Sequence, residues 1–146
     1  SGTVILSGSI GDGYSVASSL ALGADFAYMG TRFIATKEAN ADQGYKQMLI
    51  ESAADDIVYS NLFTGVSGNY LKPSIKNAGL DPNNLPEADK SAMNFGSGGN
   101  TDAKAWKDIW GSGQGIGLIK DDPSVAELVA RILEEFNHAK KEFLDK

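Results

Sequence analysis

The sequence predicts an α/β fold in which two neighbouring strands run parallel. Two short apolar segments, residues 3–6 and 24–29, have the length and composition of strands, and they flank a segment with helical spacing over residues 14–22. A strand, a helix and a second strand joined by short turns are typical of a βαβ unit, whose strands are parallel and adjacent. Hydrophobic residues make up 42% of the 146 residues, so the chain has enough apolar material for a packed core.

Each element of this unit has a local signal. The first strand consists of β-branched and apolar residues and is expected to be buried. The helix over residues 14–22 is expected to end at Gly23, because glycine readily adopts the conformation that terminates helices. The apolar residues expected on one face of this helix are Val16, Leu20 and Ala21.

The next region predicts a second helix and a third strand. Asp42 is a suitable N-cap for a helix that ends near Ala54. Residues 57–60 have the composition of a short strand. The apolar residues of the second helix are Tyr45, Met48 and Leu49.

From residue 64 to residue 117 the pattern is irregular, with Gly, Asn, Pro and Asp scattered throughout. Within it we expect a turn over residues 77–84, a loop over residues 94–100 and a short helix over residues 101–110.

The strongest local pattern is at the C-terminal end. Asp122 is a suitable N-cap, and Pro123 then takes the first helical position, where proline is tolerated because its missing N–H has no partner to lose. An apolar stripe with helical spacing follows and predicts a long amphipathic helix. The stripe consists of Val125, Leu128, Val129, Ile132, Leu133 and Phe136.

Composition excludes several kinds of chemistry. The chain has no cysteine, which removes disulfides, thiolate zinc sites, iron–sulfur clusters and a cysteine nucleophile. Its single histidine, His138, lies in the terminal amphipathic segment and is interpreted as a surface residue rather than a catalytic one. The pair Asp55 and Asp56 has no metal-ligating partner nearby in the sequence and is interpreted as a turn or cap, so no metal site is expected.

The charge balance is acidic, with a net charge of −6 and a pI near 4.7. Duplex DNA and anionic membranes are bound by clustered Lys and Arg, so neither is an expected partner. No apolar run approaches the ~18–20 residues of a membrane span, and we expect a cytoplasmic protein. Three lysines that follow the glycine turns in the sequence are expected to be solvated, as most lysines are. They are Lys37, Lys46 and Lys72.

Two glycine-bearing turns, residues 7–13 and 30–33, follow the two strands of the βαβ unit. The first has glycines in the order G-x-x-G-x-G, which is not the G-x-G-x-x-G fingerprint of dinucleotide-binding folds. Because both turns are expected at the carboxyl ends of adjacent strands, the backbone N–H groups near Gly8 and Ser9 and those near Gly30 and Thr31 could bind one phosphate. The alternative interpretation is that these glycines only permit tight turns.

The turns form part of an ordered set of blocks that resembles the nitronate monooxygenase family, formerly called 2-nitropropane dioxygenases. The resemblance covers nearly the whole chain. The blocks are GSIGDG (8–13), ALGAD (21–25), MGTRF (29–33), YKQ (45–47), LFTG (62–65), NFG (94–96), KAW (104–106) and WGSGQG (110–115).

This resemblance implies a (β/α)₈ TIM barrel that binds FMN without a covalent bond. Gly8, Gly30 and Thr31 match positions that bind the FMN phosphate, and Ser9 stands where the family usually has a second glycine. Close approach of a phosphate is slightly hindered by that change. Met29 and Arg32 flank the clamp, and Gln114 and the glycines near it match a segment close to the flavin. For Arg32 two roles stay open, one in anion binding and one in an ion pair with a neighbouring helix.

A complete barrel of this type takes about 250 residues, so we expect the chain to be the C-terminal portion of such a barrel. The expected order is a βαβ end of the barrel with the phosphate site (1–35), a helical and loop-rich segment specific to the family (36–120) and a closing amphipathic helix (121–146). In the family the catalytic base is a histidine from the earlier part of the barrel. No catalytic residue is therefore assigned here.

The function implied is FMN-dependent oxidation of alkyl nitronates by dioxygen in the parent enzyme. The isolated chain is expected to be inactive, to bind FMN weakly and to self-associate. Two alternatives remain: an FMN-dependent enoyl-acyl-carrier-protein reductase of the same fold, and a non-catalytic fragment that binds a flavin or a phosphate.

Overall fold

The computed structural model describes residues 2–87 and 108–145. They form a mixed α/β structure with two compact units, one made of Ser1–Glu51 with Gly113–Lys146 and the other of Ser52–Ser112. The predicted division into segments 1–35, 36–120 and 121–146 follows the order of the chain rather than these units, and it stays a prediction.

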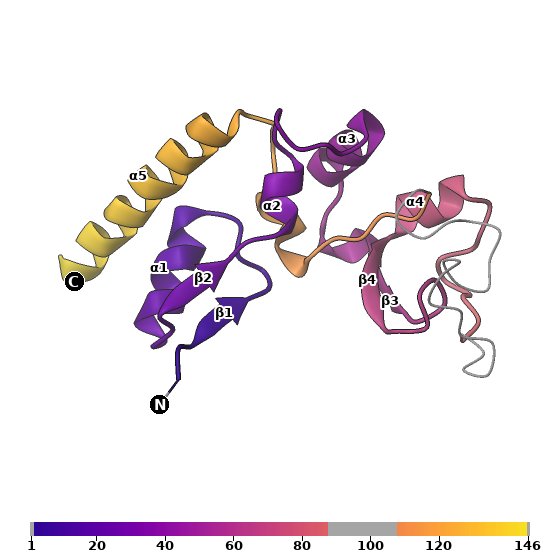
Figure 1. Ribbon diagram of the computed structural model, residues 1–146, viewed down its shortest axis with the longest axis horizontal. Coiled ribbons are helices and arrows are strands. Elements are labelled where there is room, and N and C mark those ends of the chain that lie inside the picture. The colour runs from indigo at the N-terminus through magenta and orange to yellow at the C-terminus, as the bar shows by residue number, and fades with distance from the viewer. Residues whose placement is uncertain (1, 88–107, 146) are drawn as a thin grey trace. The chain divides into compact units, whose positions relative to one another are not determined.

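The first unit contains the predicted βαβ arrangement (Figure 1). Strand β1 (Ile5–Ser7) pairs in parallel with β2 (Phe26–Tyr28), and helix α1 (Gly13–Ala21) connects them. The register places Ile5 opposite Phe26 and Ser7 opposite Tyr28. The two strands therefore end side by side, as the sequence predicted.

Helix α1 lies one residue earlier than the predicted range of 14–22 and stops before Gly23, as expected, while its N-cap Asp12 was not predicted. The Asp12 carboxylate accepts a hydrogen bond from the Ser15 amide at 2.7 Å, which satisfies one of the unpaired N–H groups of the first turn. At the other end Gly23 has a φ of +96°, the left-handed conformation that stops a helix.

The packing of this unit differs from the expectation. The first strand was expected to be buried, but Ile5 is 59% exposed, and Phe26 on the paired strand is 61% exposed. Only two strands pair in this sheet within the described residues, so no further strand covers its apolar side chains. On α1 the buried residues are Gly13 and Ser19 rather than the predicted apolar face, because small side chains allow α1 to lie close against the C-terminal helix.

Two helices follow β2. Helix α2 (Thr31–Ile34) is a single turn, and α3 (Gln43–Glu51) begins after Asp42, whose carboxylate accepts from the Gly44 amide at 2.7 Å as predicted. Lys46 on α3 is buried rather than solvated, and its amine donates to the Thr36 carbonyl at 2.7 Å. A buried ammonium needs such an acceptor, so this bond attaches α3 to the segment that follows α2.

The unit is completed by a 3₁₀ helix, η3 (Gln114–Leu118), and by α5 (Val125–Leu144). The N-cap of α5 is Ser124 and not Asp122. The Ser124 hydroxyl accepts from the Glu127 amide at 3.2 Å, while the Glu127 carboxylate accepts from the Ser124 amide at 2.8 Å. This reciprocal capping box determines where the helix begins, so Pro123 precedes the cap instead of opening the helix.

The predicted apolar stripe of α5 is only partly buried. Leu128 is fully buried, whereas Val129 and Leu133 stay exposed. No helix in residues 2–87 and 108–145 has the length and apolar character needed to cross a membrane.

The second unit is built on an antiparallel pair, β3 (Ile57–Ser60) with β4 (Gly68–Leu71), preceded by the 3₁₀ helix η1 (Ala54–Asp56) and followed by α4 (Lys72–Asn77). The sequence predicted β3 and a turn or cap at Asp55 and Asp56. It missed β4 and α4, because both are short and lie among glycine, asparagine and proline residues that favour turns.

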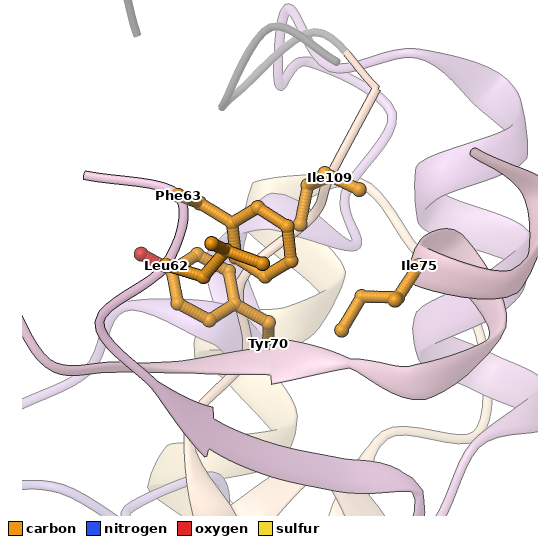
Figure 2. Packing of buried hydrophobic residues seen from close by; sticks show 5 residues of the cluster. All are labelled: Leu62, Phe63, Tyr70, Ile75 and Ile109. Carbon is orange, nitrogen blue, oxygen red and sulfur yellow. The ribbon is translucent and has the colours of Figure 1, made fainter. Parts of the chain in front are cut away.

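The core of this unit surrounds an aromatic pair (Figure 2). The rings of Phe63 and Tyr70 meet edge to face with centroids 4.9 Å apart. Leu62, Ile75 and Ile109 complete the cluster, and all five side chains are nearly or fully buried. Residues separated by almost fifty positions thus form one core.

Two sequence predictions fall mainly outside the described residues. The loop over residues 94–100 lies there entirely, as does most of the helix predicted over residues 101–110. The last three residues of that predicted helix are described as a turn and an isolated bridge region, not as helix.

Candidate functional site

The two glycine turns meet in one pocket of the first unit, with a volume of about 160 Å³. That is roughly ten times the ~10–15 Å³ needed to hold one water molecule. Three segments line it: the turn after β1, the turn after β2, and the segment around η3. The lining residues are Ser7, Gly8, Ser9, Ile10, Gly11, Tyr28, Gly30, Thr31, Arg32, Gly113, Gly115 and Ile119.

The first wall has an unusual backbone. Gly8 has a φ of +93° and Ser9 a φ of +57°, and Ser9 is the only non-glycine residue with a positive φ in residues 2–87 and 108–145. A side chain in this left-handed region costs roughly 1–2 kcal/mol. This strain explains why a glycine would suit position 9 better than the serine found here.

The second wall contains a glycine that the fold itself does not require. Gly30 has a φ of −110°, which any residue adopts, and a Cβ added there would meet no atom within 4 Å. Neither backbone conformation nor packing therefore accounts for glycine at this position. Gly30 lines the pocket, and glycine there leaves the backbone open to the close approach of a ligand.

The third wall, the segment around η3, is hydrogen-bonded to the second wall and packs closely against the first. The Thr31 hydroxyl oxygen accepts a hydrogen bond from the Gly113 amide at 2.9 Å, and the hydroxyl proton of Thr31 is then available to a further acceptor. A Cβ added to Gly115 would lie 2.9–3.0 Å from backbone atoms of Ser9. Glycine at position 115 thus permits the close contact between η3 and the first turn.

Arg32 lines the pocket, but its guanidinium group is directed at Asp121. It donates to the Asp121 carboxylate at 2.8 Å and to the Asp121 carbonyl at 3.1 Å, and to the Ala35 carbonyl at 3.4 Å. Its side chain is only 2% exposed. Of the two roles left open for Arg32, the ion pair is formed, with a residue just before α5; direct anion binding by Arg32 stays a prediction.

Asp121 is shared by two arginines. Arg131 on α5 donates to both oxygens of its carboxylate, at 2.7 and 3.0 Å. These hydrogen bonds from Arg131, together with the charge of Arg32, lower the pKa of Asp121. Burial lowers the pKa of Arg32, whereas the hydrogen bond with Asp121 raises the pKa of Arg131.

The lowered pKa of Asp121 predicts a stability difference that depends on pH. Because ionised Asp121 is favoured in the folded state, its contribution is present in full above about pH 4, the ordinary aspartate range, and is lost as the pH falls through the lowered pKa. Urea unfolding at pH 7 should show Asp121→Asn to be less stable than the wild type, with the gap closing below about pH 4. A gap that is the same at both pH values would contradict this. Glu87→Gln, which neutralises an exposed carboxylate, is the control.

The structure brings together most of the predicted site residues. Gly8, Ser9, Gly30, Thr31 and Arg32 all line the one pocket. Met29 is half-buried and Gln114 is exposed, and neither is among the lining residues. Their proposed flavin contacts stay predictions.

Some residues that line the pocket could not be predicted from the sequence. Tyr28 and Ile119 have apolar or aromatic side chains with no local motif to indicate a binding role. Gly113 and Gly115, by contrast, flank Gln114 in the WGSGQG block, which the resemblance placed close to the flavin, and both line the pocket.

His138 lies away from this pocket, on the surface of α5. Its side chain is 56% exposed and lies 3.5 Å from the Glu142 carboxylate, and its ring meets Tyr14 edge-on. It is a surface residue, as the sequence indicated.

The chain is similar to known proteins over most of its length. The family model described as nitronate monooxygenase matches residues 3–135. A nitronate monooxygenase of Paraburkholderia phytofirmans is 33% identical over 142 residues, which cover 93% of this chain and 38% of that protein. One from Neurospora crassa is 28% identical over 145 residues, covering 90% and 37%. The chain thus spans less than two fifths of the length of these relatives.

Solved structures with the same fold include FabK from Thermotoga maritima, with a TM-score of 0.68 and 23% identity over 98% of this chain and 47% of that one. A nitroalkane oxidase from Streptomyces ansochromogenes has a TM-score of 0.66 and 21% identity over 97% and 41%. Because the family model matches residues 3–135, nearly all of the sequence, the chain belongs to the nitronate monooxygenase family.

Proposed function

We propose that the protein oxidises alkyl nitronates with dioxygen by means of FMN held in a (β/α)₈ TIM barrel. In this proposal the present chain contributes the grip on the FMN phosphate. Family membership supports the reaction class. The bound flavin would supply the redox chemistry, while the protein supplies binding, orientation and electrostatics.

The observation that carries the proposal is Gly30, because the fold gives no reason for glycine there. It follows the end of β2, and it shares a pocket with Gly8 and Ser9, which follow the end of β1. Backbone N–H groups at such an edge suit a phosphate, whose oxygens are strong acceptors. The residues that line the pocket are mainly the two glycine turns and the η3 segment, so the proposal places the phosphate there and leaves the contacts of the ring system unassigned.

Each residue has a limited task in this proposal. The amides of Thr31 and Arg32 belong to the first turn of α2, where a helix has no carbonyl to satisfy them, and they would donate to phosphate oxygens. The Thr31 hydroxyl would add one donor. Gly8 and Gly30 would let the phosphate approach the backbone. No residue of the chain is assigned to move the nitronate proton.

Gly30→Ala tests the phosphate grip. The added methyl group should lower the affinity for FMN by about tenfold or more, because it prevents hydrogen bonds to a charged group worth ~1.5–3 kcal/mol. Affinity for riboflavin, which has the same ring without the phosphate, should not change. NMR titration of the ¹⁵N-labelled chain measures both, and weak binding remains visible as shifts of the amides at positions 8, 9, 30 and 31.

Gly117→Ala is the matched control, because a Cβ at Gly117 also meets nothing within 4 Å and Gly117 does not line the pocket. Both variants should retain the melting temperature of the wild type. An unchanged preference for FMN over riboflavin in Gly30→Ala would reject the phosphate grip.

Activity assays of the full-length protein distinguish the proposed reaction from the two alternatives that the sequence left open. Oxygen consumption with an alkyl nitronate supports the proposed reaction. Oxidation of NAD(P)H without nitronate turnover would instead indicate the enoyl-acyl-carrier-protein reductase. Flavin binding with neither activity would indicate a non-catalytic protein. Self-association stays a prediction, to which the exposed strands β1 and β2 lend support.

A further inference from the structure

We propose that Asp121 is a positioning residue for phosphate binding: through Arg32 it holds the turn after β2 against the η3 segment, so that the walls of the pocket keep their shape. This inference rests on the proposed function, and it adds a residue that touches neither the pocket nor the ligand. Asp121 lies 89 residues from Arg32 in the chain.

The first step is that η3 is tied to the turn after β2 on both sides. Before η3, the Gly113 amide donates to the Thr31 hydroxyl at 2.9 Å. After η3, Asp121 accepts from Arg32 at 2.8 Å through its carboxylate and at 3.1 Å through its carbonyl. Thr31 and Arg32, which are consecutive in the chain, are thus hydrogen-bonded to residues on either side of the η3 segment that contains Gly115. Loss of the second tie would leave this wall attached at one end.

The second step concerns α2 itself. The Arg32 guanidinium also donates to the Ala35 carbonyl at the far end of this four-residue helix. A helix of one turn has little intrinsic stability, because nucleation is costly and few hydrogen bonds form. The link from Asp121 through Arg32 to Ala35 therefore joins the first turn of α2, which contains the amides proposed to face the phosphate, to the end of the helix and to Asp121.

The third step is the choice between two roles for Arg32. Its side chain is buried, and the planar fork of the guanidinium spans acceptors on two segments. Arg131 holds the same carboxylate from the exposed side and so keeps Asp121 in place. Such an arrangement is suited to maintaining geometry, since both terminal nitrogens of Arg32 already donate to acceptors of the protein.

The effect of Asp121→Asn on the affinity for FMN distinguishes a positioning role of Arg32 from direct pairing with the phosphate. If Arg32 acts as a clamp, the variant should lose about tenfold in FMN affinity with riboflavin affinity unchanged. If Arg32 pairs with the phosphate directly, removing its carboxylate partner should leave FMN affinity equal or increased, and this result would overturn the inference. A general loss of stability would weaken the binding of both flavins alike, and a parallel loss of this kind would also count against a positioning role.

The ligand-free protein provides a second readout. Hydrogen exchange of the amides at positions 31–34 and 113–119 should become about tenfold faster in Asp121→Asn, while exchange in β1 stays the same. Unchanged exchange at these amides would refute the inference whatever the flavin does. A wild type without preference for FMN over riboflavin would instead reject the proposed function, and the exchange measurement would still decide whether Asp121 orders this turn.

Glu127→Gln is the matched control. It removes one negative charge from the same part of the chain, and glutamine preserves the capping box with Ser124. Its FMN affinity should stay within twofold of the wild type. If Asp121→Asn does not fold, Arg32→Lys decides the question, because lysine keeps the positive charge and loses the fork. A clamp predicts about a tenfold loss, and full retention of FMN affinity by Arg32→Lys would overturn the inference.

Discussion

Gly13→Ala is expected to lower the free energy of unfolding by about 3 kcal/mol, at the upper end of the usual cost of overpacking. Gly13 is the first residue of α1. A Cβ there would overlap the Ile132 carbonyl oxygen and the Phe136 amide nitrogen of α5. Backbone atoms in the middle of a helix cannot move aside without breaking that helix, so the two helices would have to separate.

Separation would also break the hydrogen bond in which the Gly13 amide donates to the Glu135 carboxylate at 2.8 Å. This bond satisfies one of the amides at the start of α1, and its charged acceptor makes it stronger than a neutral one. Urea unfolding followed by circular dichroism measures the loss. Gly117→Ala supplies the comparison, since its methyl group enters open space. Equal stability of the two variants would show that α1 and α5 do not pack this closely.

Phe63→Ala is expected to cost about 3–5 kcal/mol in the second unit, the usual range for deleting a buried aromatic side chain. Phe63 is fully buried, and its ring meets that of Tyr70 edge to face at 4.9 Å. Its removal leaves a cavity among Leu62, Ile75 and Ile109 (Figure 2). Hydrogen exchange of the paired amides of β3 and β4 reports on this unit directly and should become much faster.

Tyr59→Ala is the control for Phe63→Ala. Tyr59 is an aromatic residue of β3, but it is 71% exposed, so its loss should cost less than about 1 kcal/mol. Comparable acceleration of exchange in the two variants would mean that the cluster around Phe63 does not hold this unit together.

The candidate site was predictable where its signals are local. The order of strand, helix and strand follows from short apolar segments and from a glycine helix stop, and parallel pairing follows from the connection itself. Once two strands are adjacent and parallel, their ends meet, which brings Ser9 and Thr31 to one pocket. The glycines at positions 8 and 30 were therefore identified without coordinates.

Other features depended on competition between local signals. Asp122 and Ser124 both have the chemistry of an N-cap, and Ser124 prevails because Glu127 completes a capping box with it. Strand β4 and helix α4 are stabilised by contacts with β3 and the core rather than by their own propensities. A short segment among turn-forming residues has no period long enough to reveal such contacts.

The βαβ unit and the two phosphate-turn candidates could be predicted from the sequence, because they depend on neighbouring residues and on the handedness of the connection between the strands. The family could be predicted from the order of the sequence blocks along the chain. The direction of the Arg32 side chain, the absence of any atom near a Cβ at Gly30, and the position of Gln114 outside the pocket could be established only from the folded chain. Those features depend on atoms far apart in the sequence, such as Arg32 and Asp121, and their meeting is set by packing rather than by any local pattern.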